Sequence, residues 1–131
     1  MPPDLSGLIG IPFLDGGRTL AGMDCWGLAR EAMRRFGHEV PDFQVSCFDS
    51  AAISGIYEAE KGNWERVEVP EPGCVVAMSI DGRMPGMVQH LGVYLGAGRI
   101  LHTLKKRESH IVRIDDPYWS GRIAGIFRWV G

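Results

Sequence analysis

The hydrophobic pattern of this chain changes its period part-way along, and this change constrains the fold more than any other feature. Apolar side chains between residues 25 and 36 recur along one helical stripe, formed by Cys25, Ala29, Ala32, Met33 and Phe36. From residue 75 onwards the apolar runs are short and are separated by glycine and proline, which is typical of strands. This order predicts an α+β fold in which N-terminal helices pack on an antiparallel β-sheet.

The ends of the first helix are marked by residues that commonly begin and end helices. Asp24 is suited to cap the N-terminus, and Gly37 is suited to follow the last turn, so we expect a helix over residues 25–36. A weaker helical pattern covers residues 47–60. Glycines and a proline interrupt residues 1–23, which we expect to form an irregular arm.

The second half of the chain carries the strand signals. We expect a turn over residues 70–73, a loop over 81–86, and strands over residues 75–78, 87–95, 99–104, 110–114 and 122–130. The strands at 87–95 and 99–104 flank Gly96-Ala97-Gly98, which predicts a hairpin.

Size, charge and composition exclude several classes of protein. The 131 residues predict one domain over 1–131, and 45% hydrophobic with 23% charged residues excludes a disordered chain. A net charge of −2 argues against a nucleic-acid partner. No apolar run approaches the roughly 20 residues of a membrane span. The N-terminus lacks the basic and apolar segments of a signal peptide, so we expect the protein to be made in the cytoplasm of a bacterial host without export by such a peptide.

Three cysteines, Cys25, Cys47 and Cys74, stand too far apart for a CxxC pair, which argues against a disulfide framework and a zinc site. Of the three, Cys25 alone falls in the first turn of a clearly predicted helix. Unpaired backbone N–H groups and the helix dipole favour a thiolate there, so we expect a lowered pKa. The alternative interpretation of Cys25 is a small buried side chain on the apolar stripe.

Two histidines add a second element of the candidate site. His90 and His102 each lie six residues from Gly96, and an odd-residue loop centred there would place them opposite each other on one face. Their Cβ atoms would then be about 4.5–5.5 Å apart, so that one imidazole can orient the other beside a nucleophile. Taken alone, the pair is better explained as two structural sheet histidines; the cysteine at a helix start upstream reverses this preference and favours catalysis. His38 is expected in a solvated loop, and His110 is expected to begin a strand after the polar stretch 105–109, which is most simply a solvated connection. The other face of the strand carries Leu91, Val93 and Leu95, which suits the core.

The ordered motifs resemble those of NlpC/P60 cysteine peptidases over nearly the whole chain. The resembling stretches are Asp24-Cys25-Trp26-Gly27-Leu28, His90-Leu91-Gly92-Val93-Tyr94-Leu95-Gly96, Gly98-Arg99-Ile100-Leu101-His102, and the approach to the sheet over residues 64–73. The arm, with Gly10-Ile11-Pro12-Phe13 and Gly16-Gly17-Arg18, and Trp26 after the cysteine are most similar to phage tail-tip members of the family.

The resemblance implies a papain-like fold and a thiol peptidase without cofactor or metal. Cys25 would be the nucleophile, His90 the base and His102 the residue that orients His90. The implied substrate is a peptidoglycan stem peptide, typically cut at a γ-D-glutamyl–diaminopimelate bond. The implied location is the virion, where the protein would work with other tail-tip proteins to open the cell wall for DNA entry.

This sequence departs from the family pattern at three positions. Trp26 stands where many members have serine, Cys74 stands where aspartate is usual, and Phe13 is the nearest aromatic residue upstream of the nucleophile, where a tyrosine is often found. Two alternatives remain: a structural tail-tip or tail-assembly protein with little peptidase activity, and a thiol acyltransferase or amidase on the same scaffold.

Overall fold

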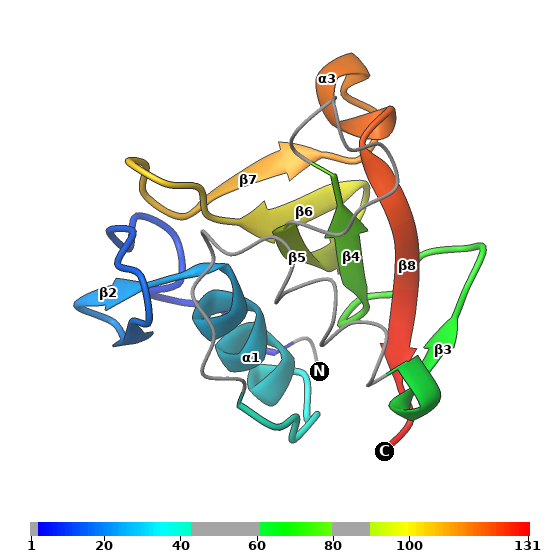
Figure 1. Ribbon diagram of the computed structural model, residues 1–131, viewed down its shortest axis with the longest axis horizontal. Helices are drawn as coiled ribbons and strands as arrows, with labels where there is room; N and C mark the ends of the chain where they lie inside the picture. The colour runs from blue at the N-terminus through cyan, green and yellow to red at the C-terminus, as the bar shows by residue number, and fades with distance from the viewer. Residues whose placement is uncertain (1–2, 43–60, 80–89) are drawn as a thin grey trace.

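The computed structural model describes residues 3–42, 61–79 and 90–131 (Figure 1). Within these residues, helix α1 (Cys25–Arg35) packs on a six-stranded sheet in which neighbouring strands are antiparallel. The strand order is β3 (Trp64–Arg66), β8 (Ile123–Trp129), β4 (Val75–Met78), β5 (His90–Gly96), β6 (Arg99–His102) and β7 (His110–Arg113). The predicted α+β architecture is confirmed.

The shorter elements lie at the margins of the sheet. A two-stranded ribbon of β1 (Arg18–Thr19) and β2 (Gly22–Met23) precedes α1, the 3-10 turn η1 (Lys61–Asn63) precedes β3, and the short helix α3 (Pro117–Ser120) precedes β8. The expected helix over 47–60, with Cys47, the loop over 81–86 and residues 87–89 of the hairpin lie outside the described residues. In the part of the chain that is described, no helix has the length and apolar character needed to cross a membrane.

Helix α1 begins and ends where its capping residues predict. The Asp24 side chain accepts a hydrogen bond from the backbone N–H of Gly27 at 2.8 Å. Phe36 is the C-terminal cap, and Gly37 follows with φ +94°, a conformation that favours glycine. The expected span of 25–36 therefore exceeds the observed helix by one residue.

The two faces of the sheet carry two different apolar clusters. One face packs against α1 and includes Val75, Val93, Leu95 and Leu101 together with Leu28, Ala29 and Met33 of the helix. The other face includes Cys74, Val76, Met78, Tyr94, Ile100 and Ile126, and Trp119 of α3 packs against it. The face of β5 that carries Leu91, Val93 and Leu95 therefore packs in the core, as the alternation of side chains along the strand predicted.

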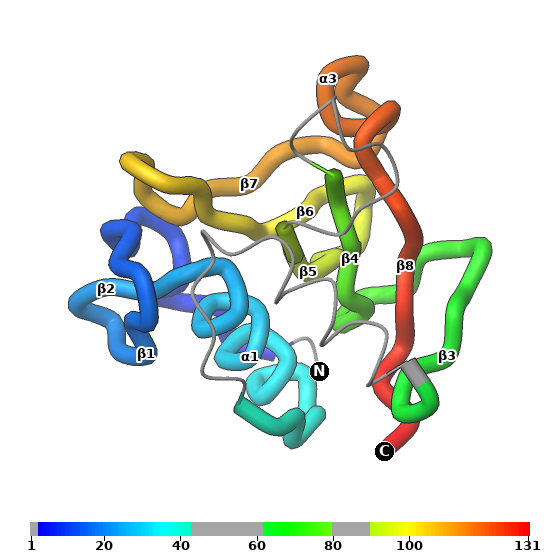
Figure 2. The backbone as a smooth tube through the Cα atoms, viewed as in Figure 1, coloured from blue at the N-terminus to red at the C-terminus, as the bar shows by residue number. Residues whose placement is uncertain are grey.

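The N-terminal arm is more ordered than predicted. Besides the β1–β2 ribbon, its backbone pairs with the connection between β6 and β7, where Gly10 donates to the carbonyl of Ser109 and Ser109 donates to that of Ile11. Figure 2 shows the arm running beside this connection. The prediction of a wholly irregular arm is wrong because these partners lie about a hundred residues away and leave no local signal in the sequence.

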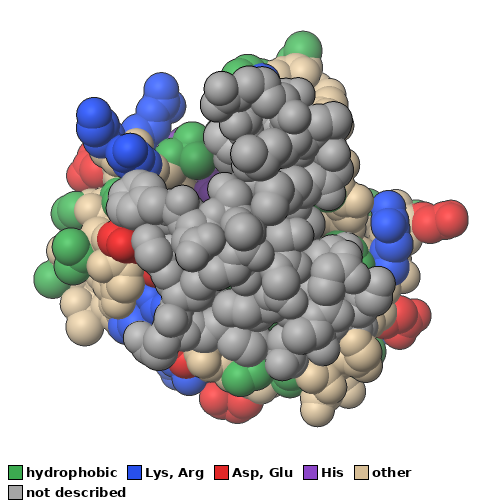
Figure 3. Space-filling model, in the orientation of Figure 1, with side chains coloured by type: hydrophobic (Ala, Val, Ile, Leu, Met, Phe, Trp, Pro, Cys, Tyr) green, Lys and Arg blue, Asp and Glu red, His purple; other side chains and the backbone are tan. Residues whose placement is uncertain are grey.

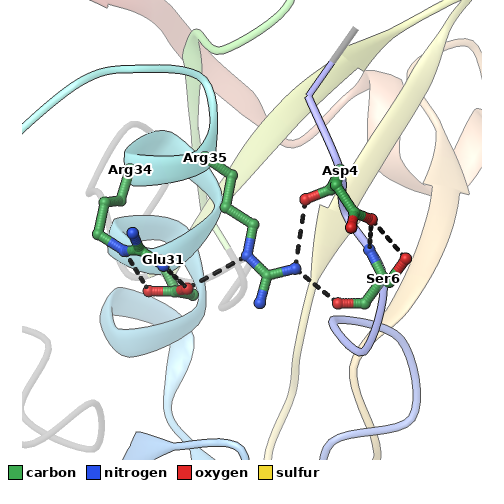
Figure 4. A network of polar contacts seen from close by, with 5 residues as sticks. All are labelled: Asp4, Ser6, Glu31, Arg34 and Arg35. Carbon is green, nitrogen blue, oxygen red and sulfur yellow. Dashed lines mark hydrogen bonds and ion pairs between the residues drawn. The ribbon is translucent and has the colours of Figure 1, made fainter.

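Side-chain contacts also tie the arm to α1 (Figure 4). Arg35 donates to the backbone carbonyls of Ser6 at 2.5 Å and Asp4 at 3.3 Å, and it pairs with Glu31 one turn earlier in the helix. Glu31 also pairs with Arg34 at 2.6 Å. The last turns of the helix are thus held against the arm.

Candidate active site

Cys25 is the first residue of α1 and is almost completely enclosed, with 5% of its surface exposed. Burial, together with the neighbouring Asp24 carboxylate, raises the pKa of its thiol to about 12. Backbone hydrogen bonds, the first of them from Leu91 of β5, act in the opposite direction. The expectation of a lowered pKa is therefore wrong for this structure, because desolvation outweighs the helix start.

The carboxylate before Cys25 is held by three groups. Asp24 is 1% exposed; its Oδ1 accepts from Arg18 at 2.7 Å as well as from Gly27, and its Oδ2 accepts from the backbone N–H of Gly16 at 3.0 Å. Arg18 also pairs with Asp42 at 2.9 Å. This network fixes the turn that carries the cysteine to the preceding ribbon.

His90 and His102 meet on the sheet face opposite α1. Nε2 of His90 lies 2.8 Å from Nδ1 of His102, and the two residues are only 3% and 1% exposed. Because Leu91 follows His90 directly, the strand that carries this pair also contributes the backbone hydrogen bond to the Cys25 thiol. The start of α1, which carries Cys25, therefore lies next to the start of β5, which carries His90, while the two histidine rings meet on the other face of the sheet.

The shared face is confirmed, but the predicted register is wrong. The hairpin turns on Ala97 and Gly98, both with positive φ, and the pairing shifts between Tyr94 and Gly96. Val93 pairs with Leu101, so His102 lies opposite Gly92 and diagonally from His90. The imidazoles still meet, because a diagonal neighbour on one face is within reach of a ring side chain.

Both histidines are held uncharged. Burial lowers the pKa of His90 to about 3, with a further contribution from the charge of His110. Burial likewise lowers the pKa of His102 to about 2, with contributions from His90, His110 and Arg107. The resting pair is therefore two neutral rings that share one hydrogen bond.

Two aromatic residues that the sequence analysis did not assign to the site surround His102. His110 pairs with His102 across β6 and β7, with ring centroids 4.5 Å apart, and its Nδ1 donates to the carbonyl of Glu108. Trp119 of α3 lies 4.7 Å from His102 at an interplanar angle of 85°. The prediction that His110 begins a strand is confirmed, but its half-buried side chain packs against the pair, which the sequence analysis did not predict.

Basic side chains lie close to this face. Lys105, Lys106 and Arg107 are exposed in the connection between β6 and β7. Figure 3 shows histidine side chains at the surface next to a group of Lys and Arg side chains. Among the described residues, no group of three or more histidines, cysteines and carboxylates is arranged to hold a metal ion. The chemistry available here is that of a thiol and imidazoles.

Cys74, the residue before β4, is a second buried thiol. Cys74 is 2% exposed, belongs to the apolar cluster on the sheet face opposite α1, and is a free cysteine. Burial raises the pKa of its thiol as well.

Comparison with known proteins places this geometry in a family. The sequence profile of the NlpC/P60 family matches residues 10–128. The chain belongs to the NlpC/P60 family. NlpC/P60 proteins are cysteine peptidases and hydrolases of the type that acts on peptidoglycan.

Two named proteins are similar to this chain over most of its length. The chain is 27% identical over 129 residues to tail tip assembly protein K of Escherichia phage lambda, covering 90% of this chain and 60% of that protein. It is 27% identical over 126 residues to gamma-DL-glutamyl hydrolase of Bacillus subtilis, covering 92% of this chain and 27% of that protein. The chain therefore spans less than two thirds of either relative.

The fold agrees with that of solved NlpC/P60 structures. NlpC2 from Trichomonas vaginalis superposes with a TM-score of 0.69 at 17% identity, over 92% of this chain and 42% of that one. At this identity the likeness concerns the fold alone.

Proposed function

We propose that this chain is a cysteine peptidase that cleaves peptidoglycan stem peptides, with Cys25 as nucleophile, His90 as general base and His102 as the residue that orients His90. The observation that carries the proposal is the 2.8 Å contact between the two buried imidazoles of His90 and His102. His90 lies on β5, and the backbone of the next residue in this strand, Leu91, bonds to the Cys25 thiol. A nucleophile, a base and an orienting group on adjoining elements are what acyl transfer through a thiol requires.

The neutral states of the thiol and the imidazole determine how the reaction starts. Because Nε2 of His90 is engaged by His102, Nδ1 is the nitrogen that takes the thiol proton. The proton moves to Nδ1 as Sγ bonds to the substrate carbonyl carbon, so the charges form only in the transition state. The backbone N–H of Cys25, at the start of α1, is a donor for the developing oxyanion.

The second half of the reaction uses the same groups in reverse. Protonated His90 returns its proton to the amide nitrogen as the carbon–nitrogen bond breaks, which leaves a thioester on Cys25. Neutral His90 then removes a proton from a water molecule, the hydroxide attacks the thioester carbonyl, and the thiol and a carboxylic acid are released. His102 stabilises the imidazolium in both halves by accepting from Nε2 of His90.

The names of the two relatives support the proposed substrate and setting. The Bacillus relative is a gamma-DL-glutamyl hydrolase, and the lambda relative is a tail tip assembly protein. We propose that this chain acts within a phage tail tip, together with other tail-tip proteins, to open the cell wall locally for DNA entry. The alternative is a tail-assembly protein with little peptidase activity, and the enclosure of Cys25 with its raised pKa favours that alternative.

The test is digestion of purified peptidoglycan, with mass spectrometry of the released peptides. Wild type is expected to release peptides with a new amino terminus within the stem, and Cys25→Ser is expected to release none. Cys74→Ser is the matched control, since it removes the other buried thiol of the described residues, and is expected to retain activity. Equal release by wild type and Cys25→Ser would contradict a thiol mechanism, and no release by wild type would favour the assembly role.

The histidine roles are tested on the same substrate. His90→Gln is expected to lose nearly all turnover, because loss of a general base costs roughly 10²–10⁴ in rate. His102→Gln keeps a hydrogen-bonding side chain beside His90 and is expected to retain measurable turnover. A more active His90→Gln variant would reverse the two roles, and wild-type activity in both would make the pair structural.

A further inference from the structure

One nitrogen of His102 is buried without a hydrogen-bond partner among the described residues. Nδ1 is engaged with His90, whereas Nε2 has no partner, and the residue is 1% exposed. A neutral imidazole carries its proton on one nitrogen and a lone pair on the other. Whether Nε2 presents an N–H or a lone pair to its surroundings is therefore decided by the groups packed against it.

The indole of Trp119 is packed against this ring. Asp116 caps α3 by accepting from the backbone N–H of Tyr118 at 2.9 Å, and this short turn places Trp119, 7% exposed, against the histidines. The rings of His102 and Trp119 meet at 85° with centroids 4.7 Å apart, an edge-to-face arrangement. The face of an aromatic ring carries partial negative charge, so it attracts an N–H and repels a nitrogen lone pair.

We propose that Trp119 is a positioning residue for the His90–His102 pair: its indole favours the tautomer of His102 with the proton on Nε2, which leaves Nδ1 as an acceptor for His90. Nε2 of His90 must then donate, so the lone pair of neutral His90 is on Nδ1. In the opposite tautomer, Nδ1 of His102 would donate, and His90 would carry its own proton on Nδ1. Only the first arrangement lets His90 accept the proton of Cys25, so the kinetic consequence rests on the proposed function.

The remaining groups around His102 keep it uncharged, and a choice between two tautomers exists only for an uncharged imidazole. His90 faces it from β5, His110 faces it from β7, and Arg107 lies in the preceding connection; all three disfavour a charge on His102. His110 donates from its own Nδ1 to the carbonyl of Glu108. From α3 the contact is the indole of Trp119.

The test is nuclear magnetic resonance of the histidine rings, using long-range proton–nitrogen correlations to assign each tautomer. Wild type is expected to show the proton of His102 on Nε2. Trp119→Leu keeps the site apolar but removes the aromatic face, so a substantial population with the proton on Nδ1 is expected. Trp119→Phe restores an aromatic face and should restore the wild-type tautomer. Trp129→Leu is the matched control, because Trp129 packs against Trp64 in another part of the sheet.

Kinetics supply a second readout. In Trp119→Leu, kcat on a stem peptide is expected to fall by roughly tenfold or more with KM nearly unchanged, and Trp119→Phe should recover most of the loss. If His102 of the wild-type protein carries its proton on Nδ1, the proposal is overturned, even if no variant folds. The proposal is also overturned if the tautomer of His102 is unchanged in a folded Trp119→Leu variant. A wild type that cleaves no peptide would instead refute the proposed function, since the tautomer is measured without substrate.

Discussion

Lowering the pH from about 7.5 to about 4.5 should remove much of the stability of this protein, because His90 and His102 are buried without charge. Their pKa values in the folded protein are about 3 and about 2, against an ordinary value of 6.5. The unfolded chain therefore binds more protons than the folded chain below pH 6.5. The stabilisation is fully present above the ordinary pKa and is lost as the pH falls towards the folded values.

The size of the loss follows from the number of protons involved. Each additional proton bound by the unfolded state lowers the free energy of unfolding by about 1.4 kcal/mol per pH unit. Two histidines over about two pH units give about 5 kcal/mol as an upper bound, which compares with a total stability of about 5–15 kcal/mol for an ordinary domain. The interval lies above the range in which most carboxylates titrate, so the histidines dominate it.

Urea unfolding at a series of pH values, followed by circular dichroism, measures this effect. His102→Asn removes one of the two protons and should roughly halve the dependence on pH. His38→Gln is the matched control, because His38 lies next to Gly73 and leaves both buried imidazoles in place, so the full dependence should remain. A free energy of unfolding that stays constant over the interval, or a His102→Asn variant with the wild-type dependence, would refute the reasoning.

Three further predictions concern the helix start. At about pH 8, Cys25 in the folded protein should react with iodoacetamide roughly 10³-fold more slowly than after unfolding. The reason is that burial raises the pKa of its thiol from 9.0 to about 12, so that far less thiolate is present. Rapid alkylation at neutral pH would instead indicate a preformed ion pair. Asp24→Ala should lower the free energy of unfolding by about 3–5 kcal/mol in urea titrations, because it removes the helix cap and an ion pair of Arg18. Asp24→Asn, which keeps an acceptor, should cost less, and equal losses would contradict this account. Gly27→Ala should lower the free energy of unfolding by about 1–3 kcal/mol, although alanine favours the helical conformation. The reason is that the new Cβ would lie 2.4 Å from the carbonyl oxygen of Gly17. A more stable variant would show that the helix start and the segment around Gly17 are not in close contact.

Local sequence patterns were enough for most of the regular structure. The cap at Asp24 and the glycine at Gly37 defined α1 to within one residue. The apolar runs located β4, β7 and β8 to within one residue at each end, and β6 ends two residues earlier than expected. These elements follow from side-chain periodicity and backbone preferences, which are properties of neighbouring residues.

Part of the candidate site was also predictable. Residues separated by an even number of positions in a strand share a face, so the assignment of His90 to one face and Leu91 to the other needed no tertiary information. The register of the hairpin did need it: two positive φ values at Ala97 and Gly98 and a shift beside Tyr94 moved the pairing by two residues. Such a shift keeps both histidines on their face, which is why their contact was predicted despite the wrong register.

The sequence by itself determined the helix that carries Cys25, the strands that carry His90 and His102, and the face that these histidines share. Only the tertiary structure decided that Trp119 and His110 pack against His102, and that burial raises the pKa of Cys25 instead of the helix start lowering it. The physical reason is that capping and alternation depend on adjacent residues. Desolvation and ring packing depend on segments far apart in the chain, whose distances are set only when the whole core has formed.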